Sequence, residues 1–233
     1  MKKILIISAF LLIANISGAQ VLISLLLGDK LNSPNIEFGL EGGLNFTNIN
    51  GFENNRGVRN FNLGFYFDIR MKNNLYLYTG VQGLSGLGMG KLSAADLEFL
   101  DADIYEVEGT YNQRIKSFMV PILANYKFAN HIYLEAGPQV GLLYKSWVDF
   151  TSDQDNKDWN IKEYNYDLVN WFNGGIAFGA GYKLMKGEGW TIGVRYYQGL
   201  TNVFKDKSGS LHHSLHFKVN IPIGVAKTDE TES

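Results

Sequence analysis

Three histidines and a serine lie close together near the C-terminal end of the chain, at His212, His213, Ser214 and His216. A base beside a hydroxyl can activate a nucleophile, and a carboxylate from a neighbouring strand would complete a catalytic triad. Because neighbours in a strand point to opposite faces, Ser214 can share a face with His212 or His216 but not with His213. The alternative is a set of polar residues that fill the interior of a barrel near its rim. The strand pattern around them favours this second interpretation over a hydrolase.

Carboxylates gather in two further segments, at Asp96, Glu98, Asp101 and Asp103 and at Asp153, Asp155 and Asp158. The second segment lacks the ligand series and the glycine of a calcium-binding loop. The glycine-rich run Gly86–Gly90 has no following Lys-Ser/Thr, so it is not a phosphate-binding loop. We therefore predict no metal or cofactor site. These acidic loops are candidate partner-binding surfaces, with loose bridging by divalent cations to lipopolysaccharide phosphates as the alternative.

A third group of charged residues falls at alternating positions inside predicted strands. Its members are Glu37, Glu41, Asp68, Arg70, Glu135, Lys145, Lys183 and Arg195. All eight share the polar face of their strands, opposite an apolar face. In a narrow barrel these side chains would pair across the lumen, which predicts a structural network of salt bridges.

The strands that position these groups are clearest between Asn60 and Gln82, in NFNLGFYFDIRMKNNLYLYTGVQ. Apolar residues occupy every second position on either side of a Lys-Asn-Asn turn, which indicates a hairpin with two different faces. Each run has about a dozen residues, whereas ordinary strands have roughly 5–6 and strands that cross a bilayer need roughly 9–11. The length favours a membrane barrel with its apolar face toward lipid and its polar face toward the lumen.

Eight strands of this kind are predicted, at 36–46, 60–71, 75–90, 115–128, 131–148, 169–184, 190–198 and 213–225. The connections after the first, third, fifth and seventh strands are long, at 48–58, 91–112, 149–167 and 201–211, and the others have a few residues each. Outer-membrane barrels alternate short periplasmic turns with longer extracellular loops in this way. The predicted fold class is therefore all-β, an eight-stranded antiparallel up-and-down transmembrane β-barrel. A soluble barrel of the lipocalin type, with the apolar face inside, is the alternative.

The composition and the two ends of the chain fit an exported protein. Residues 1–19 have two lysines, an apolar run and Ser-Gly-Ala, which predicts a secretory signal peptide. We expect an N-terminal lead-in at 20–35, the barrel at 36–225 and a charged tail at 226–233. The net charge of -2 argues against a nucleic-acid partner, and the chain has no cysteine. A closed barrel needs no disulfide, because its backbone hydrogen bonds form a continuous ring.

Several segments resemble a known family, in the order EGGLNFTNI, FMVPILANYKF, IYLEAGPQVGLLY, GGIAFGAGYKL and RYYQGLTNV. Together they are similar to the PorT-like outer-membrane β-barrel domain, over most of residues 36–225. The resemblance implies an eight-stranded barrel in the outer membrane, with lipid and lipopolysaccharide around it and the barrel-assembly machinery as its partner during biogenesis. The chain departs from the usual pattern at its end, IPIGVAKTDETES, which has no terminal aromatic residue.

The size of the predicted barrel limits its function. An eight-stranded barrel has an interior only about wide enough for side chains, so a pore for large solutes is not expected. We expect a structural or partner-binding role through the extracellular loops, with an envelope protein as the partner and no catalytic activity. A narrow ion channel is the second interpretation, and an outer-membrane lipid-modifying hydrolase is the third.

Overall fold

The computed structural model describes residues 31–53, 56–154 and 157–224. The predicted signal peptide at 1–19, most of the lead-in at 20–35 and the tail at 226–233 lie outside these residues. No helix in the described ranges is long and apolar enough to cross a membrane.

Within these ranges the chain forms one antiparallel sheet of nine strands with three short helical elements. The strands are β1 (Ile36–Ile49), β2 (Val58–Lys72), β3 (Leu75–Gly90), β4 (Thr110–Lys127), β5 (Ile132–Gln154), β6 (Lys157–Tyr164), β7 (Phe172–Lys183), β8 (Thr191–Asn202) and β9 (Leu211–Pro222). The helical elements are α3 (Ala94–Phe99), the 3-10 turn η2 (Tyr166–Leu168) and α4 (Leu184–Gly187).

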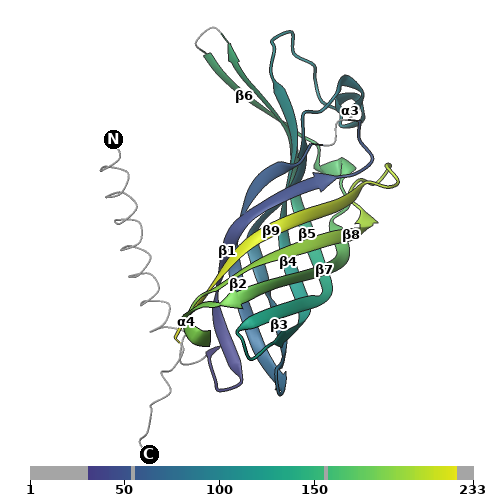
Figure 1. The fold of residues 1–233 in the computed structure, drawn as a ribbon. Helices are drawn as coiled ribbons and strands as arrows, with labels where there is room; N and C mark the ends of the chain where they lie inside the picture. The colour runs from purple at the N-terminus through teal and green to yellow at the C-terminus, as the bar shows by residue number, and fades with distance from the viewer. Residues whose placement is uncertain (1–30, 54–55, 155–156, 225–233) are drawn as a thin grey trace, which may run out of the picture.

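Eight of these strands close into a ring (Figure 1). β1 pairs with β2 on one side and with β9 on the other, and the pairing of β4 with β5 completes the circle. The predicted eight-stranded antiparallel up-and-down β-barrel is confirmed. β6 is not part of the ring, because it pairs only with the last part of β5. We call the end that carries α3 and β6 the loop end, and the opposite end, near α4, the turn end.

The two faces of the wall have the predicted chemistry. On β2 the side chains of Phe61 and Phe65 are 56% and 49% exposed on the outside, whereas Asn62, Tyr66 and Asp68 are buried inside. Aliphatic and aromatic residues cover the outer face in the same way on the other strands. This is the inverse of a soluble barrel, which buries its apolar row around a ligand.

Two of the long connections contain more structure than the sequence indicated. The predicted loop at 149–167 is wrong over most of its length, because β5 continues to Gln154 and pairs with β6 as a hairpin. Asp153 and Asp158, two of the charged residues that suggested a loop, are paired with each other near the tip of this hairpin. The predicted loop at 91–112 contains α3, whose N-terminus is a capping box between Ser93 and Asp96, and β4 already begins at Thr110.

The glycine-rich run at the end of β3 stays paired with β4 but leaves the ladder with β2, and it packs against the inner face of β1 and β2. The β2–β3 register ends at Leu63 and Leu84. Beyond that point Thr47 Oγ1 of β1 donates to the Gly88 carbonyl at 3.1 Å, and a Cβ atom on Gly88 would fall 2.9 Å from the side chain of Val58. Glycine is required here because two layers of backbone overlap without room for a side chain.

An apolar cluster fills the lumen at the loop end. α3 and the loops contribute side chains that pack onto residues from the strands below, and the buried members include Ile49, Phe52, Leu87, Met89, Leu97, Leu100, Ile115, Val148, Val203 and Phe204. We call this group the apolar cap. It packs into the interior below the long connections, where its buried side chains are shielded from water.

Candidate functional site

Four charged side chains from four strands meet inside the lumen. Arg195 of β8 donates through Nε to Glu135 Oε1 at 2.7 Å and through Nη1 to Glu41 Oε1 at 3.3 Å. Lys218 of β9 lies 2.9 Å from Glu135 Oε2 and 3.6 Å from Glu41 Oε2. All four are buried. Two cations and two carboxylates thus balance one another away from bulk solvent, as buried charges require. We call these four residues the central ion cluster.

A glycine of β7 leaves the space that the contact between Arg195 and Glu135 needs. Gly179 pairs with Glu135 on one side and with Arg195 on the other. A Cβ atom at Gly179 would fall 2.9 Å from Glu135 Oε1. The missing side chain therefore lets Arg195 reach across an intervening strand to its carboxylate.

Neutral polar groups complete the section around Glu41. The Tyr78 hydroxyl and the Gln82 side-chain amide both donate to this carboxylate. Asn220 in turn donates to the Tyr78 hydroxyl at 2.7 Å, and the Arg195 guanidinium lies 5.0 Å from the centre of the Tyr78 ring. The lumen is thus packed with interacting side chains at this level.

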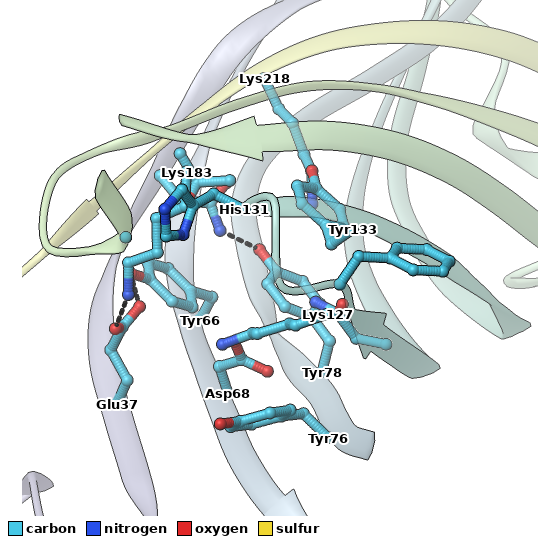
Figure 2. Close-up of a pocket in the computed structure, with 15 residues that line it drawn as sticks. Glu37, Tyr66, Asp68, Tyr76, Tyr78, Lys127, His131, Tyr133, Lys183 and Lys218 are labelled. Atoms are coloured by element: carbon cyan, nitrogen blue, oxygen red, sulfur yellow. Dashed lines mark hydrogen bonds and ion pairs between the residues drawn. The ribbon is translucent and has the colours of Figure 1, made fainter. Parts of the chain in front are cut away.

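Two ion pairs and a cavity lie on the turn-end side of the central ion cluster, and Figure 2 shows the side chains that line the cavity. Lys183 Nζ lies 2.5 Å from Glu37 Oε2, and Lys127 Nζ lies 2.5 Å from Asp68 Oδ2. The Tyr66 hydroxyl donates to Glu37 at 2.9 Å. The cavity beside these pairs has a volume of about 190 Å³. Its lining carries both signs of charge, from Glu37 and Asp68 and from Lys127 and Lys183.

The structure places most of the predicted lumen residues in these two groups, namely Glu37, Glu41, Asp68, Glu135, Lys183 and Arg195. Arg70 instead lies exposed at the turn end, where its Nε donates to the Asn73 carbonyl at 3.3 Å. The prediction for Lys145 is wrong. Lys116 pairs with Lys145 but Ser117 pairs with Leu143, so a bulge in β5 turns Lys145 to the outer face.

The predicted network lacked two lysines that the structure contains, Lys127 and Lys218. Both follow the alternation that identified the other members. Lys218 lies on the polar face between His216 and Asn220, and Lys127 lies between two outward-facing aromatic residues. The alternation of inward-facing and outward-facing residues therefore indicated both lysines, because it continues to the ends of the strands.

The serine and histidine near the C-terminal end do come together, but not as a nucleophile and its base. Ser214 Oγ lies 2.6 Å from His216 Nε2, and Asn62 Nδ2 lies 2.8 Å from His216 Nδ1. Since the amide nitrogen of Asn62 can only donate, Nδ1 accepts and Nε2 carries the proton that it shares with Ser214. A nitrogen that already holds its proton cannot accept one from the hydroxyl. Ser214 and His216 are also buried, away from any substrate.

The predicted acidic loop residues differ in whether they are buried or exposed. Asp96 is buried and accepts hydrogen bonds from the backbone N–H groups of Ser93 and Glu53, both at 3.1 Å, so its role is to hold α3 in place. The exposed members are Glu98, Asp101, Asp103 and Asp153. Asp155 lies outside the described residues, and Asp158 belongs to β6 without a described side chain. Among the described residues no group of three His, Asp or Glu side chains is arranged to hold a metal ion.

A tyrosine and a glutamate connect the loop that follows α3 to the β5–β6 hairpin. The Tyr105 hydroxyl donates to Glu163 Oε1 at 2.8 Å, and the Asp103 N–H donates to Glu163 Oε2 at 2.9 Å. The hydrogen bond to the carboxylate raises the pKa of Tyr105 to about 12. Between the loop and the hairpin lies an open groove of about 740 Å³, whose lining includes Glu108, Asp153 and Trp159.

A match to a protein family agrees with this architecture. A family model described as an outer membrane protein beta-barrel domain matches residues 30–205. Similar solved structures include Ail, the attachment invasion locus protein of Yersinia pestis, at 8% identity and a TM-score of 0.44, over 82% of this chain and 100% of that one. Ail in complex with the heparin analogue sucrose octasulfate aligns at 10% identity and a TM-score of 0.45, over 81% and 99%. Neisserial surface protein A aligns at 8% and 0.43, over 79% and 96%. No curated protein sequence matches the chain significantly.

Proposed function

Since the chain belongs to the outer membrane protein beta-barrel domain family, we propose that it is a closed, non-catalytic barrel that binds an envelope protein through its extracellular loops. In barrels of this class the short turns face the periplasm and the long connections lie outside the cell. The loop end is therefore extracellular and the turn end is periplasmic. Both the lumen and the extracellular structure support the proposal.

The filled lumen supports a closed barrel over the second candidate, a narrow ion channel. The central ion cluster occupies one section and the apolar cap occupies the section above it. For ions to pass, Arg195 would have to leave two buried carboxylates, and breaking such a group costs about 3–5 kcal/mol. The cavity near the periplasmic end lies below this obstruction and does not bypass it.

The extracellular structure supports partner binding. The main observation for it is the far edge of β6. β6 ends the sheet order, so its far edge has no neighbouring strand among the described residues. Such an edge presents backbone N–H and C=O groups to which a strand of another protein can pair. Trp159 on the same strand is 42% exposed and lines the groove, where it can anchor a bound chain.

A photo-crosslinking amino acid placed at Trp159 in living cells tests this proposal. The expected result is one defined adduct with an envelope protein. The matched control is the same amino acid at Lys72, which lies exposed at the periplasmic end. The absence of an adduct from Trp159, or the same adducts from both positions, would contradict a specific extracellular partner.

The third candidate, a lipid-modifying hydrolase, finds little support in the Ser214–His216 pair, because His216 holds its proton toward the serine. We expect Ser214→Ala to leave the acylation of lipopolysaccharide unchanged when the lipid is analysed by mass spectrometry. A loss of acyl-chain remodelling in this variant would instead favour an enzyme.

Two finer assignments are part of the proposal. Membership of the PorT-like branch rests on the segments FMVPILANYKF and RYYQGLTNV, which lie in β4 and β8 except for the last residue of each. Export rests on residues 1–19, whose removal would leave a mature chain that begins at Gln20. N-terminal sequencing of the protein from purified outer membranes tests the cleavage directly.

A further inference from the structure

Four cationic side chains lie near the extracellular end of the barrel on the side that faces away from the lumen, three on the wall and one on the β5–β6 hairpin that extends from it. Arg114 and Lys116 belong to β4, Lys145 to β5 and Lys162 to β6. Lys116 and Lys145 are directly opposite each other across the β4–β5 pairing. Like charges in this position destabilise a sheet. None of the four forms an ion pair with a carboxylate of the described residues.

The cations surround a tryptophan beside a shallow hollow. Lys145 Nζ and Lys162 Nζ lie 5.7 and 5.9 Å from the Trp147 ring. Arg114 Nη1 donates to the Arg59 carbonyl at 3.2 Å, which fixes the guanidinium beside the hollow. The hollow has a volume of about 260 Å³ and is lined by side chains that include Asn60, Arg114, Lys116, Trp147, Asp149 and Lys162. Asp149 supplies one negative charge against the four positive ones.

The depth of this group in the membrane follows from β4. Its outward-facing row runs from Phe128 at the periplasmic end through Ile122 to Phe118, all exposed. The ten steps from Phe118 to Phe128, at roughly 3.3 Å each on a strand tilted by about 40°, span about 25 Å, which is the height of the apolar band of such a barrel. Lys116 is the next outward-facing residue above Phe118. The cations thus begin where the hydrocarbon ends and the lipid head groups start.

We propose that Arg114, Lys116, Lys145, Trp147 and Lys162, which we call the rim site, bind a phosphate group of lipopolysaccharide in the outer leaflet. A phosphate between Lys116 and Lys145 turns their repulsion into two charge-assisted contacts. The guanidinium of Arg114 matches phosphate oxygens in geometry as well as in charge. The proposal rests on the proposed function, in which the loop end is extracellular, and it explains why unpaired lysines persist on a lipid-facing wall.

The test uses the purified full chain refolded in a nonionic detergent. Binding of lipid A that carries both phosphates is measured by native mass spectrometry for the wild type and for Lys116→Gln/Lys145→Gln. Because each basic residue at an anionic membrane surface strengthens binding about fivefold, we expect the double variant to bind roughly 25-fold more weakly. The matched control, Lys72→Gln/Lys205→Gln, removes the same charge from exposed positions elsewhere and should bind like the wild type.

Two further measurements distinguish a lipid phosphate from free phosphate. Dephosphorylated lipid A should bind the wild type at least as weakly as phosphorylated lipid A binds the double variant, because the variant keeps Arg114 and Lys162. Inorganic phosphate at millimolar concentration should not displace the lipid, and displacement by free phosphate would overturn a lipid-specific site. Equal binding by the wild type and the double variant would overturn the rim site itself.

A gel comparison of boiled and unboiled protein comes first, because a folded barrel migrates differently from its boiled form. If the wild type shows no such shift, the barrel on which the proposed function depends fails. If every variant shows the shift but the lysines make no difference to lipid binding, only the rim site fails.

Discussion

Arg195 donates to Glu135 at 2.7 Å across an intervening strand, and both side chains are hidden from solvent. The contact joins β8 to β5 through the space left by Gly179 on β7. Together with Glu41 and Lys218 it ties four strands of the ring at one level. The barrel therefore holds its cross-section by charge pairing at that level and by apolar packing under the loops.

Replacing Arg195 by methionine should destabilise the barrel strongly. Glu41 and Glu135 would then share only Lys218, which leaves one buried carboxylate without compensation. The expected loss is about 3–5 kcal/mol in the free energy of unfolding, measured by urea unfolding in detergent or vesicles. The double variant Arg195→Met/Glu135→Leu should recover part of it. A loss below about 1 kcal/mol would mean that the cluster contributes little.

The ion pair near the periplasmic end should behave differently. The side chains of Lys183 and Glu37 are 18% and 19% exposed, so water screens their attraction and can replace it. We expect Lys183→Met to cost only about 1 kcal/mol or less in the same unfolding assay. An effect as large as that of Arg195→Met would show that this pair is effectively buried.

Two glycines of β3, Gly88 and Gly83, should differ in how well they tolerate a side chain. A side chain at Gly88 would meet Gln113 backbone and Val58, whereas the nearest atom to a side chain at Gly83 is 3.9 Å away, on Phe118. We expect Gly88→Val to destabilise the barrel by about 1–3 kcal/mol through overpacking. Gly83→Val should be tolerated. Equal effects in unfolding experiments would contradict the overlap of β3 with β2.

The strands and their faces were predictable from the sequence because side chains in a strand alternate with a period of two. Phe61 and Phe65 outside and Tyr66 and Asp68 inside follow directly from that rule. β6 was not predictable in the same way, because the charged residues around the hairpin tip also suit a solvated loop. α3 has only six residues, and its capping box and the buried Leu97 hold it in place rather than a long helical pattern.

Tyr105 gives a prediction for alkaline pH. Its hydrogen bond to Glu163 raises its pKa to about 12, above the ordinary value of 10. The contribution of this contact to stability is fully present below pH 10 and is lost as the pH rises through 12. The difference in absorbance at 295 nm between the wild type and Tyr105→Phe should titrate near pH 12. With Glu163→Gln as the background, the same difference should titrate closer to pH 10. Titration near pH 10 in the wild type would rule out the contact.

The sequence predicted which residues face the lumen better than it predicted which of them contact one another. That Glu135 and Arg195 face the lumen follows from alternation, but their contact depends on the strand register and on Gly179 between them. For Lys145, alternation alone predicted the wrong face of the strand. One extra residue in β5 reverses the face of every position beyond it, and no local sequence signal marks the bulge. Register and bulges depend on the whole ring, so they follow from the fold and not from a single strand.

The most direct test of a closed barrel is electrical. The purified full chain, shown to be folded by its shift on a gel, is inserted into a planar lipid bilayer and the current is recorded under voltage clamp. Because the central ion cluster and the apolar cap fill the lumen, we expect the membrane current to stay at its baseline. Discrete current steps that appear with the folded protein and vanish after boiling would show that ions cross the lumen, and the closed barrel would be wrong.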